Sequence, residues 1–339
     1  MPDAVKWAQI ALAMTDHDLK ALPPLRTNFT NPTDVLNFIA AEQAQKKTCA
    51  LIIVTSTQGG GVRAPGALAG VSETGSCAGY VSNGCVDADM FSQALEAIST
   101  GQPRAVRYGT GSPYLDIRLP CGGAVDLIII PNPDAKLIAD LLTRLNQRKA
   151  VSIMGSLEHG FEIGLPSDTF TGWRDDKFHL HCTPKLRLRI AGRGTEPIAL
   201  MRAAHALDYE VLLQSPDEDR LEAALALGCK AQRLPSAAHP PYIYDDAHTA
   251  FVLMFHDHDW ETELLKQALE SDAFYIGALG GRTTHKNRCQ ALKDSGCSQA
   301  QIEKIYGPIG LISSLRNASS LAISVLAEII DVYENKTVS

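Results

Sequence analysis

From Lys185 onward the chain alternates short apolar strands with amphipathic helices, and this rhythm restricts the folds that its second half can adopt. A helical pattern follows most of these strands. Such an alternation favours a parallel sheet with helices on both faces, the doubly wound α/β class. The predicted strands are 186–191, 209–214, 250–255 and 274–279, and the predicted helices are 197–207, 218–227, 261–271 and 319–333.

The first half lacks a clean strand–helix–strand rhythm, so it predicts a mixed α+β domain that precedes the doubly wound one. A length of 339 residues is enough for two domains, each with its own core. We place the first domain, with its connector, at 1–184 and the second at 185–339. The predicted helices are 31–46, 86–99 and 134–148, and the predicted strands are 49–56, 67–72, 105–108, 115–119, 124–130 and further strands within 150–184.

Glycine is concentrated between Gly59 and Gly123, which contain 13 of the 26 glycines of the chain. Such clusters mark places where the backbone takes a positive φ or approaches something closely. Two clusters end beside a cysteine, Cys85 or Cys121, and the turn at 58–66 carries Arg63. Bare amides next to thiols indicate a surface that holds a ligand, in particular an anionic one. The alternative is that both thiols pack beneath the loops.

A second group of glycines suggests that the α/β domain also meets an anion. Gly192-Arg193-Gly194 separates a predicted strand from a helix, as in the opening of a Rossmann-like dinucleotide-binding fold. Pro197 replaces the last glycine of that fingerprint, and the expected acid is displaced to Asp217. Gly280-Gly281-Arg282 pairs bare backbone with a guanidinium, which suits phosphate or carboxylate, or forms a tight turn with a solvated arginine. These glycine turns predict a nucleotide-like ligand for this domain. The alternative function is that of an NAD(P)-dependent oxidoreductase.

Composition excludes several classes of protein. A net charge of −7 argues against a general nucleic-acid binder, and no apolar run is long enough to span a membrane. The N-terminus makes a poor signal peptide, so we expect a cytoplasmic protein with its eight cysteines reduced. No cysteine or histidine spacing indicates a metal site, and no serine, histidine and acid set indicates a hydrolase.

Several blocks of the sequence resemble the XdhC/CoxI family, and they occur in the family's order across both domains. Asp87 stands where that family usually has glutamate, and Asn83 where it usually repeats glycine. The match covers most of the chain. The blocks are Gly79–Asp87, Tyr108–Gly123, Tyr275–Gly280, Gly307–Leu311 and Ile323–Ile330.

The resemblance implies a maturation chaperone for molybdenum hydroxylases of the xanthine dehydrogenase type, not a turnover enzyme. It implies bound molybdenum cofactor, as molybdopterin or its dinucleotide, protected while sulfur is inserted and then delivered to an apo molybdenum-hydroxylase subunit. The pattern is similar to chaperones of aldehyde oxidoreductases, which use the cytosine dinucleotide. A cofactor nucleotidyltransferase and a cysteine desulfurase are implied as further partners, and a homodimer or a cofactor-free scaffold stays open.

The residues that we expect to hold the cofactor come from the glycine clusters of both domains. Gly-rich amides suit its phosphate, and thiols suit molybdenum or a transferred sulfur. They are Cys121, Cys85, Gly122, Gly123, Gly59, Gly60, Gly61 and Arg63 in the first domain, and Gly192, Gly194, Gly280 and Arg282 in the second.

Overall fold

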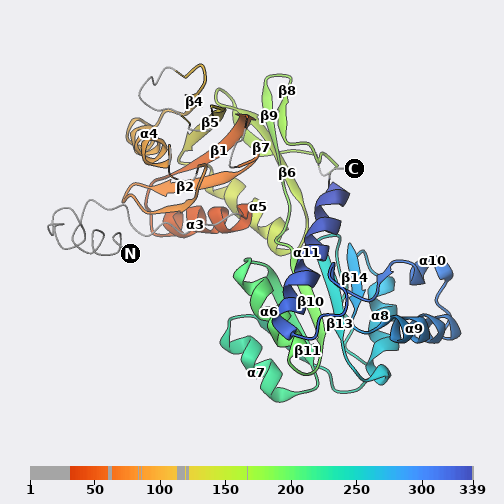
Figure 1. The fold of residues 1–339 in the computed structure, drawn as a ribbon. Helices are drawn as coiled ribbons and strands as arrows, with labels where there is room; N and C mark the ends of the chain where they lie inside the picture. Colours follow the sequence, from red (N-terminus) through yellow and green to blue (C-terminus); the bar gives the residue numbers. More distant parts are fainter. Residues whose placement is uncertain are drawn as a thin grey trace, which may run out of the picture. The chain divides into compact units, whose positions relative to one another are not determined.

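The computed structural model describes residues 31–337, except 60–62, 83, 85, 113–118, 120–121 and 166. The chain divides into two compact units, Met1–Pro184 and Lys185–Ser339 (Figure 1). Within the described part of the chain, no helix combines the length and the apolar character that crossing a membrane requires.

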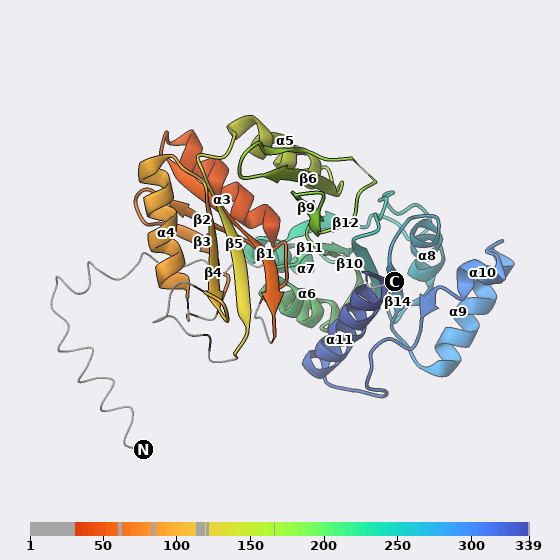
Figure 2. The same ribbon diagram turned by 90° about the horizontal axis from the view of Figure 1, so that it is seen from above.

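Unit 1 is built on a five-stranded antiparallel sheet in the order β3-β2-β1-β5-β4. Helix α4 packs on one face, whereas α3 and α5 pack on the other (Figure 2). Asn31 begins α3 by accepting a hydrogen bond from the Thr33 amide at 2.9 Å. The bounds are α3 (Pro32–Ala44), β1 (Cys49–Gln58), β2 (Leu68–Ser72), β3 (Cys77–Gly79), α4 (Asp87–Thr100), β4 (Arg104–Gly109), β5 (Ala124–Pro131) and α5 (Ala135–Asn146).

A second antiparallel sheet completes unit 1, in the order β7-β6-β9-β8. Phe178 and Leu180 are buried in the same core as α3 and α5, so this sheet covers the face opposite α4. The strands that the sequence predicts within 150–184 are therefore present, whereas the strand predicted over 115–119 falls largely outside the described residues. The bounds are β6 (Val151–Ser156), β7 (Gly160–Ile163), β8 (Gly172–Arg174) and β9 (Lys177–Cys182).

Unit 2 is a six-stranded parallel sheet in the order β12-β11-β10-β13-β14-β15. Helices α6, α7 and α11 share one core with the sheet, and α8, α9 and α10 share the other, which confirms the doubly wound prediction. The bounds are β10 (Arg187–Gly192), α6 (Glu196–Ala206), β11 (Glu210–Ser215), α7 (Glu218–Ala226), β12 (Lys230–Arg233), β13 (Thr249–Met254), the 3-10 turn His258–Trp260, α8 (Glu261–Leu269), β14 (Tyr275–Ala278), α9 (Arg282–Asp294), α10 (Gln299–Ile302), β15 (Ile305–Tyr306) and α11 (Ala318–Thr337).

The guanidinium of Arg189, in the central strand β10, is buried beside this sheet. Arg189 of β10 is fully buried, and its Nε lies 2.9 Å from both carboxylate oxygens of Asp245. Its Nη1 donates to Gln214 at 2.9 Å, and its guanidinium stacks over the Phe251 ring at 3.8 Å. Burial lowers the pKa of Arg189, and the Asp245 carboxylate opposes that shift. The pair therefore satisfies itself inside the protein and tethers the segment around residue 245 to the sheet.

Candidate functional site

The glycine clusters of unit 1 lie at one edge of its five-stranded sheet, where strands β1, β3 and β4 end. In the pairing register, Gln58 at the end of β1 faces Ala124, and Gly109 at the end of β4 faces the same residue. Gly79 at the end of β3 faces Ala69 near the start of β2, and Ala69 pairs with Ile52 in the middle of β1. The loops that follow residues 58, 79 and 109 therefore leave the sheet on the same side.

Backbone is packed against backbone where two of these clusters meet. A Cβ on Gly59 would lie 3.2 Å from the Gly123 Cα, and Gly59 has a φ of +73°. A Cβ on Gly109, with a φ of +86°, would lie 2.1 Å from the Gly123 carbonyl oxygen. The Gly122 amide donates to the Leu119 carbonyl at 2.9 Å, so it has a partner within its own turn. These glycines are needed for close approach of the chain to itself.

Two arginines connect the loops at this edge. Arg107 donates to both carboxylate oxygens of Asp126, at 3.0 and 2.9 Å, and to the Gln58 side chain at 3.3 Å. The guanidinium of Arg63, which the sequence assigned to the site, lies 4.7 Å from the centre of the Tyr80 ring. Arg107 was not foreseen, because nothing in its sequence context distinguishes it from a solvated strand residue.

The backbone of the loop between β3 and α4 binds the carboxylate of a residue of the protein itself, Asp87. Asp87 is almost fully buried, and its carboxylate accepts hydrogen bonds from three backbone amides of that loop. These come from Val81 at 3.3 Å and from Ser82 and Gly84 at 3.0 Å. The glycine-rich backbone here therefore holds a side chain of the protein, and not all of its amides are available to a ligand.

The two thiols that the sequence singles out, Cys85 and Cys121, lie outside the described residues, as do Gly60 and Gly61. The cysteines that the structure describes are free, and four of them are buried. Burial raises the pKa of Cys49 to about 11 and that of Cys182 to about 12. Because a thiol reacts as its thiolate, these two are poor ligands and nucleophiles.

This difference can be measured on the native protein at pH 8. We expect iodoacetamide to leave Cys49 and Cys182 unmodified, because their thiolate fraction is on the order of one thousandth or less. The half-buried Cys289 and Cys297 should react within the same time. Peptide mass spectrometry after timed quenching provides the measurement. Alkylation of Cys182 as fast as that of Cys297 would contradict the burial argument.

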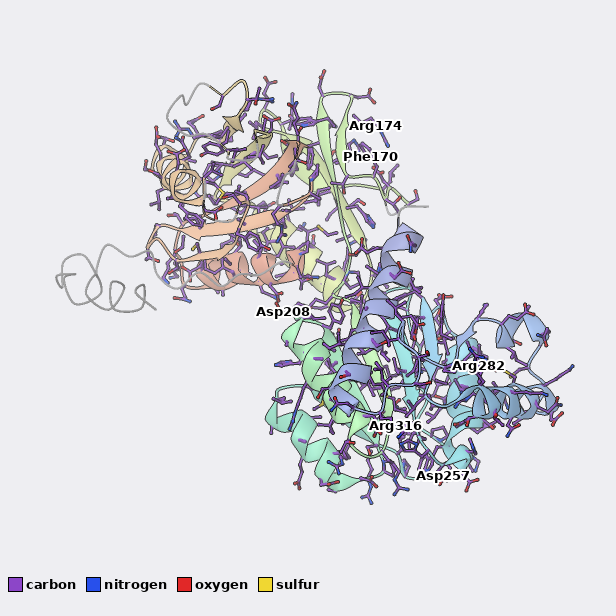
Figure 3. All side chains as sticks on the ribbon, in the orientation of Figure 1. Phe170, Arg174, Asp208, Asp257, Arg282 and Arg316 are labelled. Atoms are coloured by element: carbon purple, nitrogen blue, oxygen red, sulfur yellow. The ribbon has the colours of Figure 1, made fainter. Side chains whose placement is uncertain are left out.

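In unit 2, the predicted glycine turns lie along one edge of the parallel sheet. Gly192 ends β10 beside Met254, and β14 ends two strands away, ahead of Gly280. The strand order matches that of dinucleotide-binding folds, whose ligands bind at this carboxyl edge. A Cβ on Gly192 would lie 2.8 Å from the Cγ of Pro197 in α6 and 2.5 Å from the Met254 carbonyl oxygen, so glycine lets α6 pack closely on the sheet. Arg282, the first residue of α9, is exposed (Figure 3).

Two carboxylates modify the chemistry of this edge. Glu196 opens α6, and its Oε2 would lie 3.2 Å from a Cβ on Gly194, while its Oε1 lies 3.6 Å from His256. A negative charge therefore already stands at the positive end of the helix, where a phosphate would approach. Asp217, the displaced acid of the fingerprint, binds Arg193 at 2.8 Å. Neither carboxylate is arranged as in a complete dinucleotide-binding site.

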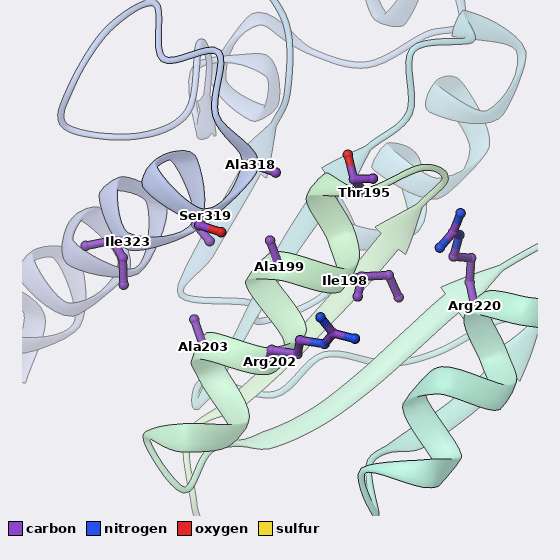
Figure 4. Close-up of a pocket in the computed structure, with 10 residues that line it drawn as sticks. Thr195, Ile198, Ala199, Arg202, Ala203, Arg220, Ala318, Ser319 and Ile323 are labelled. Atoms are coloured by element: carbon purple, nitrogen blue, oxygen red, sulfur yellow. The ribbon is translucent and has the colours of Figure 1, made fainter.

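A groove of about 610 Å³ runs along the outer side of α6 (Figure 4). Its walls come from α6, from Arg220 of α7 and from the first turns of α11. The sequence did not reveal it, because it exists only once α11 packs beside α6, which lies far earlier in the chain. Among the described residues, no group of three or more histidine, cysteine or acidic side chains is arranged to hold a metal ion.

Comparisons with known proteins agree with this architecture. The family model described as the XdhC Rossmann domain matches residues 188–329, and that of the XdhC and CoxI family matches residues 42–109. The molybdenum cofactor insertion chaperone PaoD of Escherichia coli (strain K12) is 34% identical over 298 residues, which are 88% of this chain and 87% of PaoD.

A crystal structure described as a xanthine dehydrogenase from Bacillus halodurans has a similar fold. Its TM-score is 0.71 at 20% identity, and the match covers 90% of this chain and 96% of that one. At this identity the likeness concerns the fold alone. The family matches and the relative over most of both chains go further: this chain is a member of the XdhC/CoxI family.

Proposed function

We propose that this protein is a chaperone that binds molybdenum cofactor and inserts it into an apo molybdenum hydroxylase. The observation that carries this proposal is the 34% identity to a molybdenum cofactor insertion chaperone along 88% of the chain. The finer form of the proposal is that the cargo is the cytosine dinucleotide and the client is the molybdenum subunit of an aldehyde oxidoreductase. The chain would protect the cofactor and would not turn over a substrate.

The loop edge of unit 1 is the proposed cradle for the metal-bearing part of the cofactor. Gly59 and Gly123 meet there, and Arg63, which follows Gly59 in the same loop, lies against the Tyr80 ring of the adjacent loop. These groups suit a phosphate, while the thiols of Cys121 and Cys85 suit molybdenum or a sulfur in transit. Because the Gly122 amide is already bonded within its turn, the phosphate would depend more on Gly123 and Arg63.

In unit 2, we propose the carboxyl edge of the parallel sheet, with Gly192, Gly194, Gly280 and Arg282, as a nucleotide-binding edge. The strand order and the uncapped start of α9 support it. The cytosine nucleotide of the cargo is the ligand of this class that the chaperone would meet. The enzymes that supply cytidylate and sulfur, a nucleotidyltransferase and a cysteine desulfurase, are the proposed donors, and a homodimer is compatible with the chain.

An NAD(P)-dependent oxidoreductase is the weaker candidate. The fingerprint lacks its last glycine, Glu196 stands beside the glycine turn, and Asp217 is engaged by Arg193. Each of these features disfavours a dinucleotide pyrophosphate in its usual place. A fluorescence titration with NADH separates the two functions, and we expect no binding.

Replacing Cys121 by alanine tests the proposed cradle. We expect the variant, purified from a host that makes the cofactor, to retain less than about a tenth of the wild-type molybdenum, because a thiolate is a strong ligand for soft metals. Molybdenum per protein is measured by elemental analysis, and the released pterin and nucleotide by mass spectrometry. Cys297→Ala is the matched control, since Cys297 is a half-buried free thiol of unit 2.

The readouts distinguish the parts of the proposal. Wild-type retention by Cys121→Ala would remove the role given to that thiol but not the cargo. Release of molybdopterin without cytidylate would overturn the dinucleotide form. A wild-type protein that copurifies with a molybdenum subunit while carrying no cofactor would replace the chaperone by a scaffold.

A further inference from the structure

The groove on α6 combines an apolar lining with two arginines on the side of α7 (Figure 4). Small and branched apolar side chains line most of it, and Ile323 of α11 is 63% exposed although it is a large aliphatic residue. Arg202 of α6 points toward α7, on the same side of the groove as Arg220, whereas Ile323 of α11 lies on the other side of α6 (Figure 4). The apolar lining consists of Ile198, Ala199, Ala203, Ala318, Ala322 and Ile323.

The two guanidiniums are weakly neutralised. Arg202 forms no ion pair with any residue in the described part of the chain, and the carboxylate nearest to Arg220 is that of its neighbour Asp219, at 3.6 Å. Arg316, two residues before α11, is also exposed (Figure 3). In a chain with a net charge of −7, a pair of exposed basic side chains beside apolar surface is distinctive.

The apolar surface continues beyond the groove. Leu311 and Ile312 are 60% and 59% exposed, and the backbone amide of each donates a hydrogen bond to Ser324 of α11. The Leu311 amide donates to the Ser324 carbonyl at 3.3 Å, and the Ile312 amide donates to the Ser324 hydroxyl at 2.8 Å. Because Ser324 follows Ile323 in the chain, the three exposed aliphatic residues are held near one another. An exposed apolar cluster of this kind marks an interaction surface.

We propose that this surface docks an acidic, apolar-bearing segment of the apo molybdenum subunit that receives the cofactor. The inference rests on the proposed function, and it adds the place and the chemistry of the contact. Apolar side chains of the client would cover Ile323, Leu311 and Ile312, and its carboxylates would pair with Arg202 and Arg220. Arginine beside a fully covered apolar centre is the usual composition of the residues that dominate binding energy at protein interfaces.

Charge complementarity favours an acidic protein segment over the other occupants. An exposed groove with an apolar floor offers little that would fix the base and sugar of a nucleotide, which small-ligand sites do with convergent polar groups. A second copy of this chain would bring a further net charge of −7, but nothing in the described residues presents it as the partner. A nucleotide and a second copy of the chain are both tested as alternative occupants.

The experiment compares the full-length chain with single surface variants. Calorimetry measures binding to the apo molybdenum subunit of the aldehyde oxidoreductase from the same organism, purified from cells that lack the cofactor. We expect Arg202→Glu and Ile323→Asp each to weaken binding about tenfold or more, whereas Arg202→Lys weakens it less. Leu165→Asp, at a 69% exposed leucine of unit 1, is the matched control and should bind like wild type.

Each result supports or overturns the proposal. Equal affinity of all variants, or no binding of the wild-type chain, overturns the docking surface. Loss of a dimer in Ile323→Asp by light scattering, with client binding unchanged, assigns the surface to a second copy instead. Binding of cytidine diphosphate that Arg202→Glu abolishes assigns it to a nucleotide. Molybdenum content is measured in parallel, so a chain that carries no cofactor fails the proposed function separately from the docking test.

Discussion

Replacing Asp245 by asparagine is expected to lower the free energy of unfolding of unit 2 by about 3 kcal/mol or more. The Asp245 carboxylate is fully buried and compensates the equally buried guanidinium of Arg189, while Arg187 lies 3.6 Å away. Asparagine keeps the size of the side chain but removes its charge. A buried cation without its partner is costly, because neither water nor another carboxylate can replace it.

Chemical denaturation gives the free energy, and hydrogen exchange measured by mass spectrometry assigns the transition to strands β10 and β13. Glu210→Gln is the control, since Glu210 pairs with Lys230 at 2.7 Å on the surface of the same sheet and should cost less than about 1 kcal/mol. If uncompensated charge is the cause, Arg189→Met combined with Asp245→Asn should be more stable than Asp245→Asn alone. A double variant less stable than the single one would refute this explanation.

The parallel unit follows closely from its sequence, because each central strand is buried on both faces and therefore reads as a continuous apolar run. In β13, for example, Ala250 and Val252 enter one core while Phe251 and Leu253 enter the other. Helix α9 was not predicted. It buries only Arg288 and Leu292, so its pattern is mostly polar, and a buried Arg288–Glu261 pair at 2.8 Å takes the place of apolar contacts.

For the candidate site, too, some features follow from the sequence and others do not. Glycine content marks the loops of unit 1, and the antiparallel register then brings their ends to one sheet edge, which no local pattern encodes. The partners of the loop amides also escape the sequence: Asp87 reads as an ordinary residue in the first turn of a helix, yet it fills the space that an external anion would occupy. The groove on α6 depends on helices more than 100 residues apart, so only packing reveals it.

Replacing Asp87 by alanine is expected to lower the free energy of unfolding of unit 1 by about 3 kcal/mol. Its carboxylate is 1% exposed and accepts hydrogen bonds from the amides of Val81, Ser82 and Gly84. Alanine leaves these donors without an acceptor, and each buried unpaired amide costs about 1–3 kcal/mol. The substitution also removes a negative charge from the first turn of α4, where it favours the helix.

Asp134→Ala is the matched control in the same unit. Asp134 also opens a helix, but it accepts only one amide hydrogen bond, from Lys136 at 2.9 Å, and it is exposed. Its loss should cost about 1 kcal/mol. Denaturation of both variants gives the comparison, with hydrogen exchange of residues 81–86 reporting on the loop itself. Equal destabilisation by the two substitutions would show that the buried amides do not depend on Asp87.

The same variant also tests the proposed cradle. In the sequence, Cys85 follows Gly84, whose amide donates to Asp87, and precedes α4 by two residues. We therefore expect Asp87→Ala to retain less molybdenum than Asp134→Ala when both are purified at a temperature where they are folded. Because Asp87→Glu keeps a carboxylate in the segment, its molybdenum content should lie between those of wild type and Asp87→Ala. Full retention by a destabilised Asp87→Ala protein would separate the stability of this loop from cofactor binding and would place the cargo elsewhere on the edge.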